Sequence, residues 1–164
     1  MNRTLIQVFL GFVLLTLAGC GFQLRGTATV PEHLKTMYIQ GIDLQQDLGR
    51  ELKRGLQGND VLVLDSYQQG SAILTVLDNT FERRVLSVGS DAKVSEYDLY
   101  RSLTYKITDE NGQVLSADQK LIAQRDYQFD QDKVLASEQE EAELRKQLNQ
   151  QLVQSVLRRL TALK

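Results

Sequence analysis

The sequence predicts an α+β fold, a two-layer sandwich in which two amphipathic helices pack on one face of a mostly antiparallel sheet with long strands. Two observations lead to this prediction. Leucines recur at four-residue spacing in two separate stretches, which is typical of a helix with one apolar side. Three long segments are typical of strands, and the second and third of them alternate apolar and polar side chains. Because strands usually span about 5–6 residues, we expect hairpins that project beyond the packed core.

The first half of the chain predicts a strand, a helix and a second strand. Residues Thr36–Gln40 form the first strand, and Asp43 is placed to cap the helix that follows. Gly58-Asn59 is expected to end this helix through left-handed backbone. The run Val61–Leu64 is suited to a buried strand. The apolar stripe of the helix consists of Leu44, Leu48, Leu52 and Leu56.

The second half predicts three long strands and a terminal helix. The strands cover residues 71–87, 92–108 and 113–129, and the Asn-Gly pair within Asp109–Gly112 favours a tight hairpin turn between the last two. Ser137–Glu140 has the spacing of a capping box, so we expect the terminal helix to begin there. Its apolar stripe consists of Leu144, Leu148, Leu152, Val156 and Leu160.

The N-terminus is typical of a bacterial lipoprotein precursor. Arg3 precedes an apolar run that is shorter than the about 20 residues needed to span a bilayer, which indicates a secretory signal peptide. Leu17-Ala18-Gly19-Cys20 resembles a lipobox, so residues 1–19 are expected to be removed. Cys20, the only cysteine, would then carry N-acyl and S-diacylglycerol (palmitate-type) lipid. Lipoproteins kept at the inner membrane usually have Asp after the cysteine, so Gly21 resembles the outer-membrane class.

Size and composition favour a single domain over residues 20–164 that does not act as an enzyme. The remaining chain of about 145 residues suits one domain, and the net charge of -2 gives no support for nucleic-acid binding. His33 is the only histidine, so neither a zinc site nor another metal site is expected. The sequence has no phosphate-binding glycine loop and no nucleophile elbow. We therefore expect no catalytic residues and no cofactor other than the lipid on Cys20.

Basic residues near the predicted first hairpin tip are the main candidates for a binding site. Arg83, Arg84 and Lys93 bracket the tip, and guanidinium groups bind phosphate through paired hydrogen bonds. The alternative is an exposed hairpin with solubilising charge, partly neutralised by Glu82 and Asp91.

Arg101 and Arg125 present a second question, because each is in phase with the apolar face of its strand. Buried unpaired charge is unfavourable. One interpretation places both beyond the helices, facing a partner or ligand. The other lets them cross the sheet edge and reach water. The sequence does not decide between them.

The motifs together resemble the LPS-assembly lipoprotein (LptE) family. Cys20–Gly26 resembles its opening pattern C-G-[WF]-x-L-R-[GD]. The resemblance covers the whole mature chain and continues through Val30-Pro31, Ser95–Tyr97, Phe129-Asp130 and Ala136-Ser137.

This resemblance implies an outer-membrane lipoprotein in the periplasm-facing leaflet of Gram-negative bacteria. It would form an LptD-LptE complex by plugging and helping assemble the LptD β-barrel, and would bind lipopolysaccharide during its transport. Family contacts to lipopolysaccharide lie near the hairpin tip, where Arg83, Arg84 and Lys93 are the candidates. They also lie near the start of the last helix, where Ser137 replaces a basic residue and Lys133 is nearby. The alternative function is a periplasm-facing lipid-binding or structural envelope lipoprotein without a barrel partner.

Overall fold

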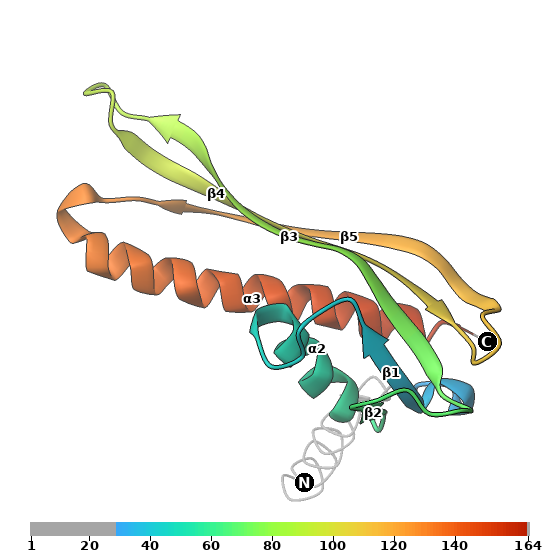
Figure 1. Ribbon diagram of the computed structural model, residues 1–164. Helices are drawn as coiled ribbons and strands as arrows, with labels where there is room; N and C mark the ends of the chain where they lie inside the picture. Colours follow the sequence, from blue (N-terminus) through green and yellow to red (C-terminus); the bar gives the residue numbers. More distant parts are fainter. Residues whose placement is uncertain (1–28, 164) are drawn as a thin grey trace, which may run out of the picture.

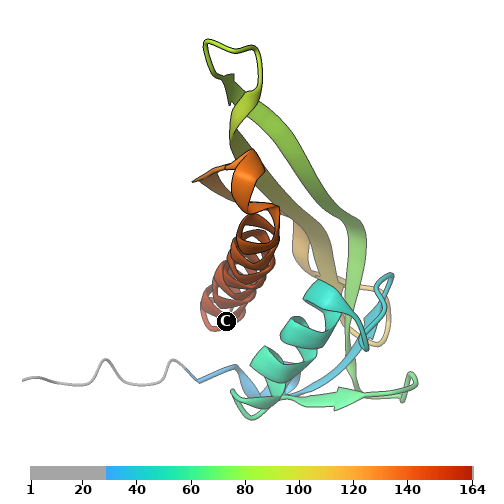
Figure 2. The same cartoon turned by 90° about the vertical axis from the view of Figure 1, so that its left-hand side faces the viewer.

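The computed structural model describes residues 29–163 and confirms the predicted two-layer α+β architecture. A five-stranded sheet has the order β2-β1-β3-β4-β5. Figures 1 and 2 show two helices, α2 and α3, on one face of this sheet, which we call the inner face. Within residues 29–163 no helix lies over the other face, which we call the outer face. The predicted signal peptide and Cys20 lie outside the described residues.

The parallel part of the sheet comes from the first half of the chain. The short 3-10 helix η1 (Glu32–Leu34) leads into β1 (Thr36–Gln40), and α2 (Asp47–Gln57) connects β1 to β2 (Leu62–Leu64). β1 pairs in parallel with β2 on one side and with β3 on the other. Leu62 is exposed although the sequence predicts a buried strand there, because β2 is a short edge strand of the sheet.

The antiparallel part contains the three long strands. β3 (Ala72–Val88), β4 (Val94–Thr108) and β5 (Val114–Gln128) agree with the predicted strands to within two residues at each end. Ala72, Leu74 and Val76 of β3 are buried, after which a bulge shifts its register against β4 and the strand leaves the core. The β3–β4 hairpin therefore extends beyond the packed layer, as Figure 1 shows.

Three predicted details at helix ends are wrong. The Asp43 carboxylate accepts a hydrogen bond from the Gln45 amide and forms a turn, so α2 begins only at Asp47. α2 ends at Gln57, directly before Gly58-Asn59 as predicted, but Gly58 keeps right-handed backbone and the left-handed residue after α2 is Asp60. The Asp130 carboxylate starts the 3-10 helix η2 (Gln131–Lys133), which runs directly into α3 (Val134–Leu160). Ser137 therefore lies inside α3 and is buried, and the predicted capping box does not begin the helix.

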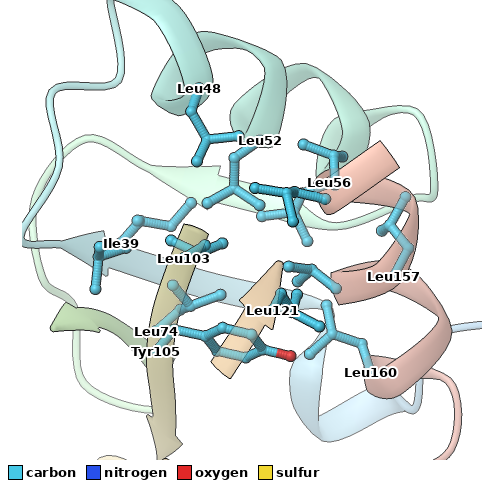
Figure 3. Close-up of a cluster of buried hydrophobic side chains, with 14 of the residues drawn as sticks. Ile39, Leu48, Leu52, Leu56, Leu74, Leu103, Tyr105, Leu121, Leu157 and Leu160 are labelled. Atoms are coloured by element: carbon cyan, nitrogen blue, oxygen red, sulfur yellow. The ribbon is translucent and has the colours of Figure 1, made fainter. Parts of the chain in front are cut away.

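The core lies between the helices and the inner face of the sheet. Figure 3 shows leucines of α2 and α3 pointing toward Leu74, Leu103, Tyr105 and Leu121 of the sheet. The predicted apolar stripes form this core, with Leu44 and Leu144 partly buried at its border. From α2 the buried residues are Leu48, Leu52 and Leu56, and from α3 they include Leu148, Leu152, Val156 and Leu160.

Gly55 sets the distance between the two helices. A Cβ atom at this position would lie 2.3 Å from Cγ1 of Val153 on α3, and that side chain is buried and stiff at χ1. We expect Gly55→Ala to lower the free energy of unfolding by about 1–3 kcal/mol, despite the better helix propensity of alanine. Urea unfolding measures this change.

A double-mutant cycle with Val153→Ala provides the control for Gly55→Ala. Shortening Val153 removes the atom that the new methyl group meets. The double variant should therefore lose less stability than the sum of the losses of the two single variants. Additive losses would contradict the close-packing explanation.

Candidate binding site at the hairpin end

The tip of the β3–β4 hairpin is a tight turn that carries the first predicted lysine. The Gly89 amide donates to the Lys93 carbonyl at 2.7 Å, and Ala92 takes left-handed backbone with a φ of 62°. The Lys93 ammonium lies 3.9 Å from the Asp91 carboxylate, and both side chains are exposed. Asp91 therefore neutralises part of the charge of Lys93, as the alternative interpretation of the tip predicts.

Arg83 points from β3 toward the N-terminal half of α3. Its guanidinium lies 2.9 Å from the Glu141 carboxylate and 4.6 Å from the centre of the Tyr97 ring. The Tyr127 hydroxyl donates to the same carboxylate at 2.7 Å. Burial and this hydrogen bond raise the pKa of Tyr127 to about 12, so its hydroxyl stays protonated. The hydrogen bond to Glu141 raises the pKa of Arg83.

Arg84 lies on the opposite face of the hairpin from Arg83. Arg83 stands opposite buried Leu99 on β4, whereas Arg84 stands opposite Asp98 on the outer face. Arg84 donates twice to the Glu82 carboxylate and stacks 4.3 Å from the centre of the Tyr100 ring. The two adjacent arginines therefore do not bind one phosphate group together, because successive side chains of a strand point to opposite faces.

Lys133, the candidate at the start of the last helix, is the N-cap residue of α3. Its ammonium lies 3.1 Å from the Asp130 carboxylate. Lys133 and Asp130 both line a hollow of about 550 Å³, which is also lined by Glu96, Asp126 and Glu140. The start of α3 lies at the same end of the molecule as the hairpin tip (Figure 1), and Lys133 there is in acidic surroundings.

A groove of about 530 Å³ separates the hairpin tip from the segment that joins β5 to α3. Its lining includes Lys93 and four carboxylates, those of Asp91, Glu96, Asp130 and Asp132. The groove itself is therefore net negative. The arginines lie outside this groove.

Large aliphatic side chains are exposed at the same end. On the hairpin these are Val85, Leu86 and Val88, each more than half exposed. At the start of α3 they are Val134 and Leu135, and Leu135 is 77% exposed. Five of the ten exposed large hydrophobic residues of the described chain therefore lie on the hairpin and at the start of α3.

Arg101 contradicts both sequence-based interpretations, because it is buried within the domain and paired. Its side chain is 3% exposed, and its guanidinium lies 2.9 Å from the Asp47 carboxylate at the start of α2. It also donates to the Asn149 side chain of α3 at 3.1 Å. Burial lowers the pKa of Arg101, and Asp47 opposes this effect. Arg101 thereby ties β4 to both helices and has no role at the surface.

Sequence reasoning missed the partners of Arg101. Asp47 accepts hydrogen bonds from Arg101, Arg145 and Asn149, and the Arg145 guanidinium stacks on the Phe81 ring at 4.5 Å. Burial alone would raise the pKa of Asp47, but the hydrogen bonds and the two arginine charges hold it below its ordinary value. One signal was available, because Asn149 follows Leu148 on the apolar side of the terminal helix.

The other sequence-based candidates have simpler places. Arg125 is exposed on β5, as the interpretation that it reaches water predicts. Within residues 29–163 no group of acidic, histidine or cysteine side chains is arranged to hold a metal ion. In the same range no helix has both the length and the apolar character needed to cross a bilayer.

The fold defines a class of protein, a small two-layer α+β domain with an elongated hairpin and exposed aliphatic side chains at one end. Comparison with known proteins then gives the family. A family model described as "LptE: Lipopolysaccharide-assembly" matches residues 34–160, and the chain belongs to this family. The family resemblance found in the sequence motifs is confirmed.

Individual relatives agree with this assignment. The chain is 33% identical over 118 residues to the LPS-assembly lipoprotein LptE of Photorhabdus laumondii. The matched segment covers 72% of this chain and 61% of that protein. The solution NMR structure of lipoprotein B from Nitrosomonas europaea has a TM-score of 0.71 at 26% identity, covering 87% of this chain and 91% of that one. A minor lipoprotein from Acinetobacter baumannii has a TM-score of 0.65 at 28% identity, covering 78% and 91%.

Proposed function

We propose that this chain is an outer-membrane lipoprotein that acts in lipopolysaccharide assembly. In this proposal it is anchored by lipid on Cys20 in the periplasm-facing leaflet, plugs an LptD-like β-barrel and helps it assemble. It also binds lipopolysaccharide on its way to the outer leaflet. Family membership and the names of its relatives support this role.

The observation that carries the lipopolysaccharide part is the composition of the hairpin end. Lipid A combines phosphate groups with acyl chains, so a surface that binds it needs cations beside apolar groups. Arg84 and Lys93 are on the same hairpin as exposed Val85, Leu86 and Val88. Lys133 lies next to exposed Val134 and Leu135.

The outer sheet face supports the barrel part of the proposal. The lumen of a transmembrane β-barrel is polar, so a plug needs a face that can form hydrogen bonds with it. The outer face presents hydroxyl and amide side chains along the three long strands, including those of Thr80, Thr104 and Gln124. The elongated β3–β4 hairpin increases the wall area that such a plug can contact (Figure 2).

Purification of the intact lipidated protein in mild detergent tests the barrel partner. We expect a large β-barrel to co-purify with it and to be identified by mass spectrometry. Recovery of the folded lipoprotein without any barrel would contradict the plug function and favour an envelope lipoprotein that works alone.

For the ligand, we expect the double variant Arg83→Ala, Arg84→Ala to bind purified lipopolysaccharide several-fold more weakly while still associating with the barrel. Loss of two guanidinium groups removes charge-assisted hydrogen bonds worth about 1.5–3 kcal/mol each when fully formed. The existing pairs with Glu141 and Glu82 must be exchanged for phosphate, which reduces the loss.

The matched control for this variant is Arg54→Ala, Arg158→Ala, which removes the same charge from exposed sites on α2 and near the C-terminal end of α3. It should bind lipopolysaccharide like the unmodified protein. Circular dichroism checks that both variants are folded. Equal binding by both folded variants would remove Arg83 and Arg84 from the site.

A further inference from the structure

The free edge of β5 is the longest unpaired row of backbone groups in the described sheet. β5 is the last strand in the order and spans 15 residues, whereas β2 at the other edge spans three. An exposed strand edge can pair with a strand of another chain. The question is which groups of β5 are available for this.

The pattern of backbone hydrogen bonds between β4 and β5 identifies the residues whose amide and carbonyl groups are available. The Phe129 amide donates to the carbonyl of the directly opposite Ser95 at 2.9 Å, so the backbone groups of Phe129 point toward β4. In an antiparallel pair such residues alternate with residues whose amide and carbonyl point away from the partner. The register is uninterrupted from Gln119 to Gln128. The outward-pointing backbone groups therefore belong to Lys120, Ile122, Gln124, Asp126 and Gln128.

Three of the common protections of an edge strand are missing from this row of groups, namely proline, a bulge and a covering helix, although the edge does carry the charged residues Lys120, Arg125 and Asp126. Within residues 119–128 there is no proline and no bulge against β4. All five outward-facing residues are exposed, and Ile122 is 50% exposed. α3 packs on the inner face and leaves the edge open. An edge that is guarded by charges alone remains open to a strand whose own charges are complementary to them.

The charges on this edge match those of a second copy of the same edge. Lys120 and Asp126 are exposed on the outer face, and neither forms an ion pair within residues 29–163. If two β5 strands pair antiparallel with Ala123 opposite Ala123, Lys120 of each copy stands opposite Asp126 of the other. Ile122 then stands opposite Gln124, and all four of these residues present outward-pointing backbone groups. Opposite charges directly across two strands stabilise their pairing.

We infer that the free edge of β5 is a strand-addition site and that its occupant is β5 of a second copy of this chain. The two sheets would join into one, related by a two-fold axis next to Ala123. A symmetric contact of this kind uses the same surface on both copies. The inference does not depend on the proposed function, because it concerns the chain in the absence of any barrel.

Charge reversal on the mature full-length protein tests this inference. Sedimentation equilibrium in density-matched detergent measures the dimer dissociation constant. Lys120→Glu makes both cross-strand charge pairs repulsive, and Asp126→Lys does the same. Each variant alone should therefore dimerise at least about tenfold more weakly than the unmodified chain. In an equimolar mixture of the two variants both pairs are attractive again, so the mixture should associate about as tightly as the unmodified chain.

Two further variants separate β5 from other contacts. Gln124→Pro removes one outward-pointing amide without removing a β4–β5 hydrogen bond, so it should abolish dimerisation while the fold remains. Lys106→Glu makes the same charge change on β4, away from the edge, and should leave the dissociation constant unchanged.

Three results would overturn the inference. The first is an unmodified chain that stays monomeric at its highest soluble concentration, as expected if a strand of a different protein occupies the edge. The second is a mixture of the two charge variants that associates no better than either alone. The third is a Gln124→Pro variant that folds and dimerises normally.

Discussion

Replacing Asp47 with alanine is expected to destabilise the domain by at least about 3 kcal/mol, because it leaves a buried arginine without its carboxylate. Arg101 is almost completely buried and lies 2.9 Å from Asp47. After the change only the Asn149 side chain would still accept a hydrogen bond from it. Folded domains are stable by only about 5–15 kcal/mol, so this loss should be visible in any unfolding experiment.

Backbone conformation adds to the cost of this variant. Asp47 has a φ of 41°, a left-handed conformation that aspartate and asparagine tolerate better than alanine. Asp47→Asn is therefore the matched control, because it removes the charge but keeps the shape and one oxygen acceptor. We expect it to lose less stability than Asp47→Ala in urea unfolding.

The partners of this ion pair should respond unequally. Arg101→Met removes the buried charge itself, and Asp47 keeps its hydrogen bonds from Arg145 and Asn149, so the loss should be smaller than for Asp47→Ala. The double variant Asp47→Ala, Arg101→Met should have a higher free energy of unfolding than Asp47→Ala alone. A larger loss for Arg101→Met than for Asp47→Ala would contradict the view that the unpaired guanidinium is the source of the instability.

Acid should reveal the same cluster. The pKa of Asp47 is lower in the folded state than its ordinary value, so this group contributes stability above the unfolded pKa of about 3.9. That contribution is lost as the pH falls from the unfolded pKa through the folded pKa. Asp47→Asn does not titrate, so the stability difference between it and the unmodified protein should shrink below about pH 4.

The sequence predicted the regular elements well because their apolar patterns are local. The leucine stripes of α2 and α3 and the alternation along β4 and β5 depend only on which side of an element faces the core. The turn at Asp109–Gly112 followed from its Asn-Gly pair, and Gly112 has the expected positive φ. Such features depend on residues that are close together in the chain.

The errors have a different origin, in competition between side chains or contacts far apart in sequence. Asp43 and Asp130 use their carboxylates in turns, which moves the starts of α2 and α3 away from the predicted caps. Arg101 finds Asp47 and Asn149, which are 54 and 48 residues away along the chain. Arg83 similarly pairs with Glu141 on α3, 58 residues away. A sequence read without an alignment does not reveal such pairs.

Replacing Cys20 with serine is expected to remove the protein from the outer-membrane fraction almost completely. The proposed anchor needs a thiol to carry diacylglycerol as a thioether, and a hydroxyl does not substitute for it. Each buried CH₂ of an acyl chain contributes about 0.8 kcal/mol, so two or more chains hold a protein stably at the membrane. A protein without an acyl chain makes only weak contact with it. We expect the variant to remain a precursor that begins at Met1, identified by mass spectrometry of its N-terminus.

Gly21→Asp is the matched comparison, because it keeps the thiol and changes only the residue after it. This variant should carry lipid like the unmodified protein but fractionate with the inner membrane, following the pattern of bacterial lipoproteins. Together the two variants separate attachment from sorting, since only Cys20→Ser should lose the lipid mass. An unmodified protein that begins at Met1 with a free thiol would contradict the anchor, and normal outer-membrane recovery of Cys20→Ser would show that other contacts hold the domain there.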